Sequence, residues 1–136
     1  MAMSDVMALL FPYVAVTGSV TVRVAVSFLP EQSAPALGRW FWSYHVRIEN
    51  DGKEAVQLLE RSWTIRDGNG QSFEVRGEGV VGETPFIQPG ESFDYVSGCP
   101  LETASGEMRG SYHLVSDGGA VFEVAIPAFP LEGAGD

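Results

Sequence analysis

The sequence predicts an all-β domain, an antiparallel sandwich of two sheets with about seven strands packed over one core. Apolar residues recur at every second position along most of the chain, which is the pattern of half-buried strands. Turn-forming residues separate these segments, and the 16 Gly and 8 Pro would interrupt any long helix. No window of helical length shows the 3.6-residue period of an amphipathic helix.

The first two expected strands show the alternation most clearly. Residues 20–28 place four valines and Phe28 on one face, with smaller or polar residues between them. A connection that contains Pro and Gly, residues 29–39, leads to the second strand, residues 40–50. One face of that strand carries Trp42, Tyr44, Val46 and Ile48.

Turn sequences delimit the other strands. The turn at residues 50–52 precedes a strand over 56–66, and the Asp-Gly-Asn-Gly turn at 67–70 joins it to a strand over 72–76. After a crossing rich in Gly and Pro, residues 77–90, three further strands are expected over 92–97, 106–116 and 120–126.

The composition suits one domain in a reducing compartment. A chain of 136 residues with 45% hydrophobic residues can build one core, which we place at 14–131, after a partly ordered leader (1–13) and before a flexible tail (132–136). The uncharged stretch 6–22 lacks the preceding positive charge of a signal peptide and is broken by Pro12. Together with the single cysteine, Cys99, this predicts a cytoplasmic protein without a membrane span.

The charge balance restricts the partners. The chain has 18 Asp and Glu against 8 Lys and Arg, a formal net charge of −10, and a pI near 4.5. Phosphate backbones and anionic membranes are bound by clusters of Lys and Arg. We therefore expect no nucleic acid or membrane partner, and we favour a basic protein or a second copy of the chain.

Catalytic and metal-binding patterns are not found in the sequence. Cys99 precedes a proline in a turn-like stretch, and His45 and His113 lie on the polar phases of their strands. No spacing typical of zinc or calcium ligands occurs. We assign no catalytic residue, metal site or cofactor, and expect a solvated acidic surface. The alternative is weak divalent cation binding by carboxylates gathered at one rim, Glu74, Glu78, Glu83, Glu91 and Asp94.

Three glycines, Gly77, Gly79 and Gly82, match the spacing of a dinucleotide-binding loop. That loop works because a helix begins within it and presents free N–H groups to a pyrophosphate. Here two prolines follow closely, and Glu78 and Glu83 would repel a phosphate. We interpret the loop as a structural crossing between sheets, with anion binding as the alternative.

Three other residues are candidates for an interface. Arg61 falls on the apolar phase of its strand, so its guanidinium must reach carbonyls or a carboxylate, or else a partner. We favour a bridge beneath the glycine loop of residues 77–82. Alternation leaves Phe41 outside the core beside Arg39, where an aromatic side chain could anchor a partner. Core packing under residues 29–39 is the alternative for Phe41.

Several sequence blocks together resemble the ApaG family over residues 17–131. The blocks are VRIEN (46–50), VQLLERSW (56–63), GEGVVG (77–82), PGE (89–91), YVSG (95–98), GEMRGSY (106–112) and IPAF (126–129). The resemblance implies a sandwich of the fibronectin type III or immunoglobulin kind without an established catalytic activity. It implies a domain that occurs alone in bacteria and is appended to eukaryotic proteins, including an F-box protein.

The sequence and the resemblance together predict a non-catalytic module for protein–protein interaction. One alternative is a nucleotide- or pyrophosphate-binding protein that uses the loop of residues 77–82. The other is an accessory protein linked to Co²⁺ or Mg²⁺ homeostasis, because the family name is attached to cobalt resistance and magnesium efflux.

Overall fold

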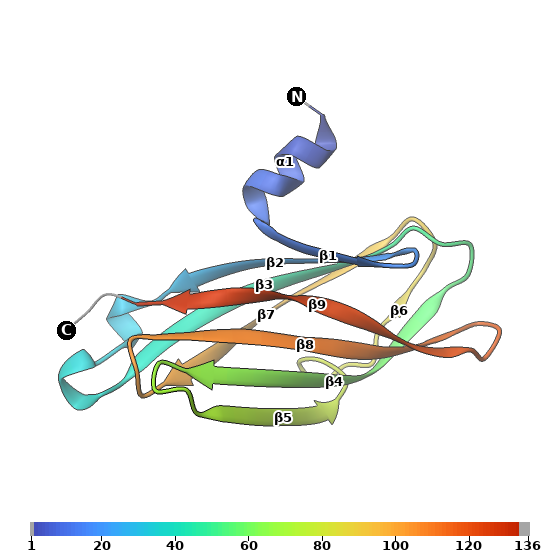
Figure 1. Cartoon of the computed structure of the whole chain (residues 1–136). Coiled ribbons are helices and arrows are strands. Elements are labelled where there is room, and N and C mark those ends of the chain that lie inside the picture. Colours follow the sequence, from blue (N-terminus) through green and yellow to red (C-terminus); the bar gives the residue numbers. More distant parts are fainter. Residues whose placement is uncertain (1, 134–136) are drawn as a thin grey trace.

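Two antiparallel sheets face each other in the computed structural model, which describes residues 2–133 (Figure 1). The first sheet has the order β1-β2-β3-β7 and the second the order β5-β4-β8-β9, with β6 paired to β4. The strands are β1 (Tyr13–Thr17), β2 (Val20–Phe28), β3 (Trp40–Asn50), β4 (Val56–Asp67), β5 (Ser72–Glu78), β6 (Phe86–Ile87), β7 (Ser92–Leu101), β8 (Ser105–Ser116) and β9 (Val121–Glu132). The helical segments are α1 (Met3–Leu10) and the 3₁₀ turns Pro30–Gln32 and Pro35–Leu37.

The inward faces of the strands follow the sequence alternation. Along β3 every second side chain, from Trp42 to Asn50, is buried, and its neighbours on the strand are partly exposed. The register between β2 and β3 runs without a bulge from Val20 opposite Asn50 to Phe28 opposite Trp42. Because a shift of one residue would turn every apolar side chain outward, this burial fixes the register.

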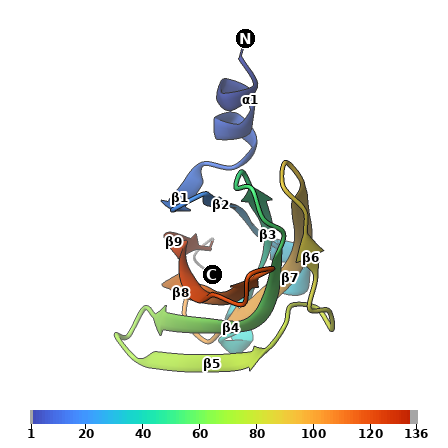
Figure 2. The same ribbon diagram turned by 90° about the vertical axis from the view of Figure 1, so that its right-hand side faces the viewer.

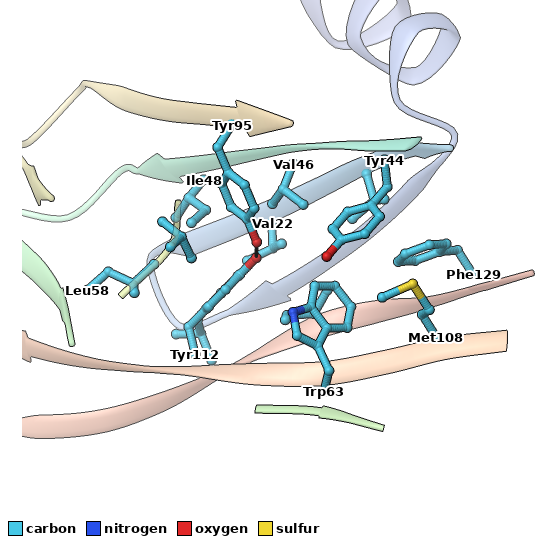
Figure 3. Close-up of a cluster of buried hydrophobic side chains, with 14 of the residues drawn as sticks. Val22, Tyr44, Val46, Ile48, Leu58, Trp63, Tyr95, Met108, Tyr112 and Phe129 are labelled. Carbon is cyan, nitrogen blue, oxygen red and sulfur yellow. Dashed lines mark hydrogen bonds between the residues drawn. The ribbon is translucent and has the colours of Figure 1, made fainter. Parts of the chain in front are cut away.

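Aromatic side chains fill the centre of the core (Figure 3). The Tyr44 and Trp63 rings are 5.3 Å apart, and Phe129 lies about 6 Å from both. The hydroxyl groups of Tyr95 on β7 and Tyr112 on β8 form a hydrogen bond across the sandwich. Among residues 2–133, every buried side-chain nitrogen and oxygen has a hydrogen-bond partner.

The two sides of the sandwich differ. On one side β1 lies beside β9, where the Ala125 N–H donates to Thr17 Oγ1 at 3.1 Å. On the other side the sheets end at β7 and β5, and Figure 2 shows β5 at the outer edge of the molecule beside β4. The sandwich is therefore closed along β1 and β9 and open between β5 and β7.

The number of strands differs from the prediction. Within residues 2–133 the structure has nine strands instead of about seven, because β1 and the two-residue β6 were not expected. The helix α1 was not expected either, since eight residues are too few to show a helical period. The segment 1–13, expected as a leader, contains this helix and the first residue of β1.

The last strand also continues beyond its predicted end at residue 126. Pro127 falls at a register shift between β8 and β9, and this bulge accommodates a residue without an N–H donor. Beyond it Phe129 and Leu131 are buried, and the Trp42 indole N–H donates to Glu132 O at 3.1 Å. The expected tail, 132–136, thus begins inside β9, and residues 134–136 lie outside the described residues.

Candidate functional site

The open side of the sandwich contains a groove of about 850 Å³ between β3 and β7 on one wall and β4 and β5 on the other. We call it the open groove. Its apolar lining includes Tyr44, Trp63, Ile65, Phe73, Val75, Leu101 and Met108. Most of this surface belongs to the inner faces of the two sheets, so the groove is the part of the core that the sheets leave uncovered.

Two side chains of β5 form the outer lip of the open groove. Phe73 pairs with Ile65 and Val75 pairs with Trp63, so both follow the inward phase of the sheet. Phe73 is nevertheless 49% exposed and Val75 42% exposed, whereas Trp63 is buried. The end of the first sheet at β7 leaves these two apolar side chains of β5 exposed beside the groove.

Arg61 lines the same groove from β4. Its Nη1 donates to Gly79 O at 2.8 Å and to Glu78 O at 3.1 Å. Gly77 lies opposite Arg61 in the register, and a Cβ atom there would stand 2.7 Å from the Arg61 Nη2. The guanidinium thus lies over Gly77 and bridges to the backbone of the glycine loop, the arrangement that the structural interpretation of this arginine describes.

The glycine loop of residues 77–82 forms a tight backbone turn. Val80 N donates to Glu83 O at 2.8 Å and Glu83 N donates to Val80 O at 2.9 Å. Between them Val81 and Gly82 both have positive φ, 44° and 81°, as in a type I′ turn. The buried Val80 side chain joins this turn to the core.

Gly79 explains why this loop requires glycine. Its φ is +63°, and a Cβ atom would stand 2.1 Å from Glu83 O. Its N–H donates to Leu59 O at 2.8 Å. The N–H groups of Gly79, Val80 and Glu83 are engaged inside the chain, and no helix follows the turn within the described residues, so this loop does not present the helix N-terminus of a dinucleotide-binding site.

Phe41 and Arg39 lie at the far end of the open groove. The Phe41 ring covers Gly98 on β7, where a Cβ atom would stand 2.4 Å from the ring. The Phe41 N–H donates to Ser33 Oγ at 3.0 Å, and Arg39 is exposed. Phe41 is thus a half-buried residue of β3 whose ring packs against β7 outside the core. The three interface candidates, Arg39, Phe41 and Arg61, line one groove.

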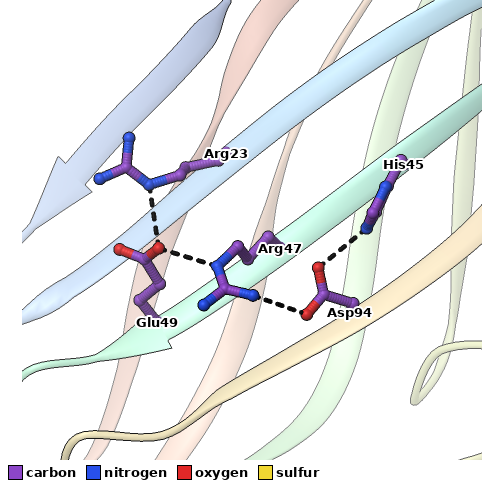
Figure 4. A network of polar contacts seen from close by, with 5 residues as sticks. All are labelled: Arg23, His45, Arg47, Glu49 and Asp94. Atoms are coloured by element: carbon purple, nitrogen blue, oxygen red, sulfur yellow. Dashed lines mark hydrogen bonds and ion pairs between the residues drawn. The ribbon is translucent and has the colours of Figure 1, made fainter. Parts of the chain in front are cut away.

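A network of ion pairs covers the outer face of the first sheet (Figure 4). Arg23 Nε and Arg47 Nε donate to Glu49 Oε2 at 3.0 and 2.9 Å. Arg47 Nη1 donates to Asp94 Oδ2 at 3.0 Å, and His45 Nε2 lies 2.8 Å from Asp94 Oδ1. Sequence reasoning did not find this network, because Asp94 reaches Arg47 only through the β3–β7 register.

The histidines and carboxylates do not gather into a centre. His45 contacts Asp94 on the first sheet, and His113 Nε2 lies 3.2 Å from Glu123 Oε2 on the second. Residues 2–133 contain no group of three or more His, Cys, Asp or Glu residues that could hold a metal ion. The same part of the chain has no helix long and apolar enough to cross a membrane.

Comparison with known proteins identifies the family to which this sandwich belongs. The family model of the ApaG domain matches residues 30–116, and the chain belongs to this family. The Bradyrhizobium (strain ORS 278) protein named ApaG is 57% identical over 120 residues, which cover 88% of this chain and 92% of the relative. The corresponding protein of Caulobacter vibrioides is 53% identical over 119 residues, 88% of this chain and 85% of the relative.

A solved structure has the same fold. The crystal structure of a Bordetella pertussis protein described as ApaA aligns with a TM-score of 0.82 at 47% sequence identity. The alignment covers 84% of this chain and 93% of that protein. The family and the β-sandwich are thereby established.

Proposed function

We propose that this chain is a protein-binding module that catalyses no reaction and that binds its partner at the open groove. The observation that carries the proposal is the exposure of Phe73 and Val75 on the inward phase of β5, continuous with an apolar groove of about 850 Å³. Apolar surface that a single domain leaves uncovered in this way is typical of an interface. Aromatic side chains at its rim, including Phe41 and Phe73, are suitable anchors.

The two alternatives have less support. Nucleotide binding would need free N–H groups in the glycine loop of residues 77–82, and those of Gly79 and Val80 are engaged in backbone hydrogen bonds, as is the N–H of the following residue, Glu83. A direct role in Co²⁺ or Mg²⁺ binding would need converging ligands, and the described residues 2–133 contain no such group. The partner class that fits an apolar groove on a chain of net charge −10 is a basic protein.

A cytoplasmic location is part of this proposal. Cys99 is buried, and burial raises the pKa of its thiol to about 11. A buried, protonated thiol is an inert core residue. The core forms without a disulfide bond, which is typical of proteins that fold in a reducing compartment.

Site-specific crosslinking tests the proposal. A benzoylphenylalanine placed at position 73 should crosslink to a partner protein in bacterial cells that produce the chain, while one at position 96 should not. Val96 is a matched control, because it is 59% exposed and lies on the outer face of β7. The partner identified in this way is then purified for binding measurements.

The second half of the test compares two charge substitutions by calorimetry. Val75→Asp should weaken binding of the purified partner at least tenfold, because it places a charge at the lip of the open groove. Val96→Asp should leave the affinity within twofold of the unaltered chain. Equal affinities for both variants, or equal crosslinking from positions 73 and 96, would contradict the proposal.

A further inference from the structure

The backbone of β5 has one hydrogen-bonded side and one open side. The hairpin closes with the Asp67 N–H donating to Gln71 O at 2.9 Å, and at the other end Gly79 N donates to Leu59 O. Residues that pair in this way alternate along an antiparallel ladder. Phe73 and Val75 therefore exchange backbone hydrogen bonds with β4, and the residues between them turn their N–H and C=O groups to the open edge. These residues are Ser72, Glu74, Arg76 and Glu78.

The other sheet edges carry features that hinder pairing with another chain. Within residues 2–133 the edge strands longer than two residues are β1, β5, β7 and β9. β7 contains Pro100, β9 contains Pro127 and Pro130, and β1 lies beside β9. Natural proteins use proline, bulges and covering elements to block strand addition. β5 contains no proline or bulge over its seven residues, so it is the least protected of the four.

We infer that an extended segment of the partner protein adds to β5 as a further strand of the second sheet. This inference rests on the proposed function and assigns its binding mode. A strand paired with Ser72, Glu74 and Arg76 would extend the sheet across the open side. Every second side chain of that strand would share the phase of Phe73 and Val75 and enter the open groove.

Charge determines what the other side chains of the segment should be. On the outer face of β5, Glu74 and Glu78 flank Arg76, and Glu60 lies opposite Glu78 on β4. Opposite charges across neighbouring strands stabilise a sheet, and like charges destabilise it. The segment that fits therefore alternates apolar residues with residues that are mostly Lys or Arg.

A proline at position 74 tests the strand addition without disturbing the β4–β5 ladder. The Glu74 N–H faces the open edge, so Glu74→Pro removes one outward donor and keeps the inner hydrogen bonds. Glu74→Ala is the matched control, because it removes the same charge and keeps the N–H. Circular dichroism checks that both variants fold, and Arg76→Pro serves as a second blocking variant.

The probe is a displayed library of random heptapeptides, selected on the unaltered chain. We expect the enriched peptides to alternate apolar and basic residues, and synthetic copies to bind Glu74→Pro and Arg76→Pro at least tenfold more weakly than Glu74→Ala. Their affinity should fall as salt is raised. Failure to enrich any peptide, or equal affinity for Glu74→Pro and Glu74→Ala, would overturn the inference.

N-methylation of an enriched peptide gives a second, independent readout. Methyl groups on the amides of one alternate set of residues should reduce binding at least tenfold, and methyl groups on the other set should change it less than threefold. This asymmetry follows because only one set faces β5 in an antiparallel pair. Equal effects of both sets would overturn the inference.

The purified crosslinked partner separates this inference from the proposed function. Weakened binding to Val75→Asp with unchanged binding to Glu74→Pro would keep the open groove as the site and reject strand addition. Unchanged binding to both variants would reject the site as well. Weakened binding to both variants is the expected result.

Discussion

The closed and open sides of the sandwich are built from the same kind of strand but differ in how they end. On the closed side, β9 continues past two prolines and brings Phe129 and Leu131 into the core. On the open side, β5 carries Phe73 and Val75 in the same inward phase, yet both remain about half exposed. The alternation of a strand therefore specifies which way a side chain points, and the opposite sheet decides whether that side chain is covered.

The largest contrast should appear when one phenylalanine is removed from each side. Phe129→Ala should lower the free energy of unfolding by about 3–5 kcal/mol, because it leaves a cavity between Tyr44 and Trp63. Phe73→Ser should change it by less than about 1 kcal/mol, since Phe73 is 49% exposed. Urea denaturation of both variants gives the comparison. Similar losses would mean that the open groove is closed in solution.

Two arginines sharpen the comparison. Arg61→Ala should cost about 2–4 kcal/mol, because it removes the bridge to Glu78 O and Gly79 O and leaves a gap over Gly77. Arg47→Ala should cost about 1 kcal/mol or less, since its ion pairs are partly exposed. Denaturation midpoints measure both. A larger loss of stability for Arg47→Ala would mean that the outer ion-pair network stabilises the fold more than the Arg61 bridge does.

Alkaline pH should weaken the core beside the groove. The Cys99 thiol has a pKa raised by burial from 9.0 to about 11, so between pH 9 and 11 it is ionised in the unfolded chain and protonated in the native one. The unfolded state then binds fewer protons, and stability falls as pH rises, by about 1–2 kcal/mol.

Burial also raises the pKa of Tyr44, Tyr95 and Tyr112, which adds to the loss at the alkaline end. Denaturation curves at pH 8.5, 9.5 and 10.5 show the trend. Cys99→Ala should reduce the loss of stability between pH 8.5 and 9.5. An unchanged loss in this variant would show that the thiol is not its cause.

The smallest effect is expected at the glycine loop of residues 77–82. ATP and GTP at millimolar concentrations should leave the melting temperature unchanged, because the N–H groups of Gly79, Val80 and Glu83 are engaged. Titration calorimetry provides the check. Saturable binding tighter than about 0.1 mM, roughly 5.5 kcal/mol, that is lost in Gly79→Val would show that this loop is a ligand site.

Local alternation was enough to predict most strands and the place of Arg61. Trp42, Tyr44, Val46 and Ile48 are buried as their phase predicts, and Arg61 reaches the backbone carbonyls that its position in the apolar phase requires. These are properties of single strands. They depend on the period of two and on the cost of burying an unpaired charge.

The open groove could not be predicted in this way. Its existence depends on where the two sheets end relative to each other, and no pattern within β5 or β7 indicates that the first sheet leaves the Phe73 side chain about half exposed. The contact of Asp94 with Arg47 could not be predicted either, because it depends on the register between two strands. β9 was predicted to end at residue 126, and the structure continues it to Glu132 through a bulge at Pro127 that the local alternation does not show.

Amide exchange measured by NMR tests the central claim most directly. With an enriched heptapeptide bound at saturation, the amides of Glu74 and Arg76 should become at least tenfold slower to exchange, because a new strand accepts their hydrogen bonds. The amides of Phe73 and Val75, which already pair with β4, should change little. Saturated binding that leaves Glu74 and Arg76 exchanging at their free rates would contradict strand addition at β5.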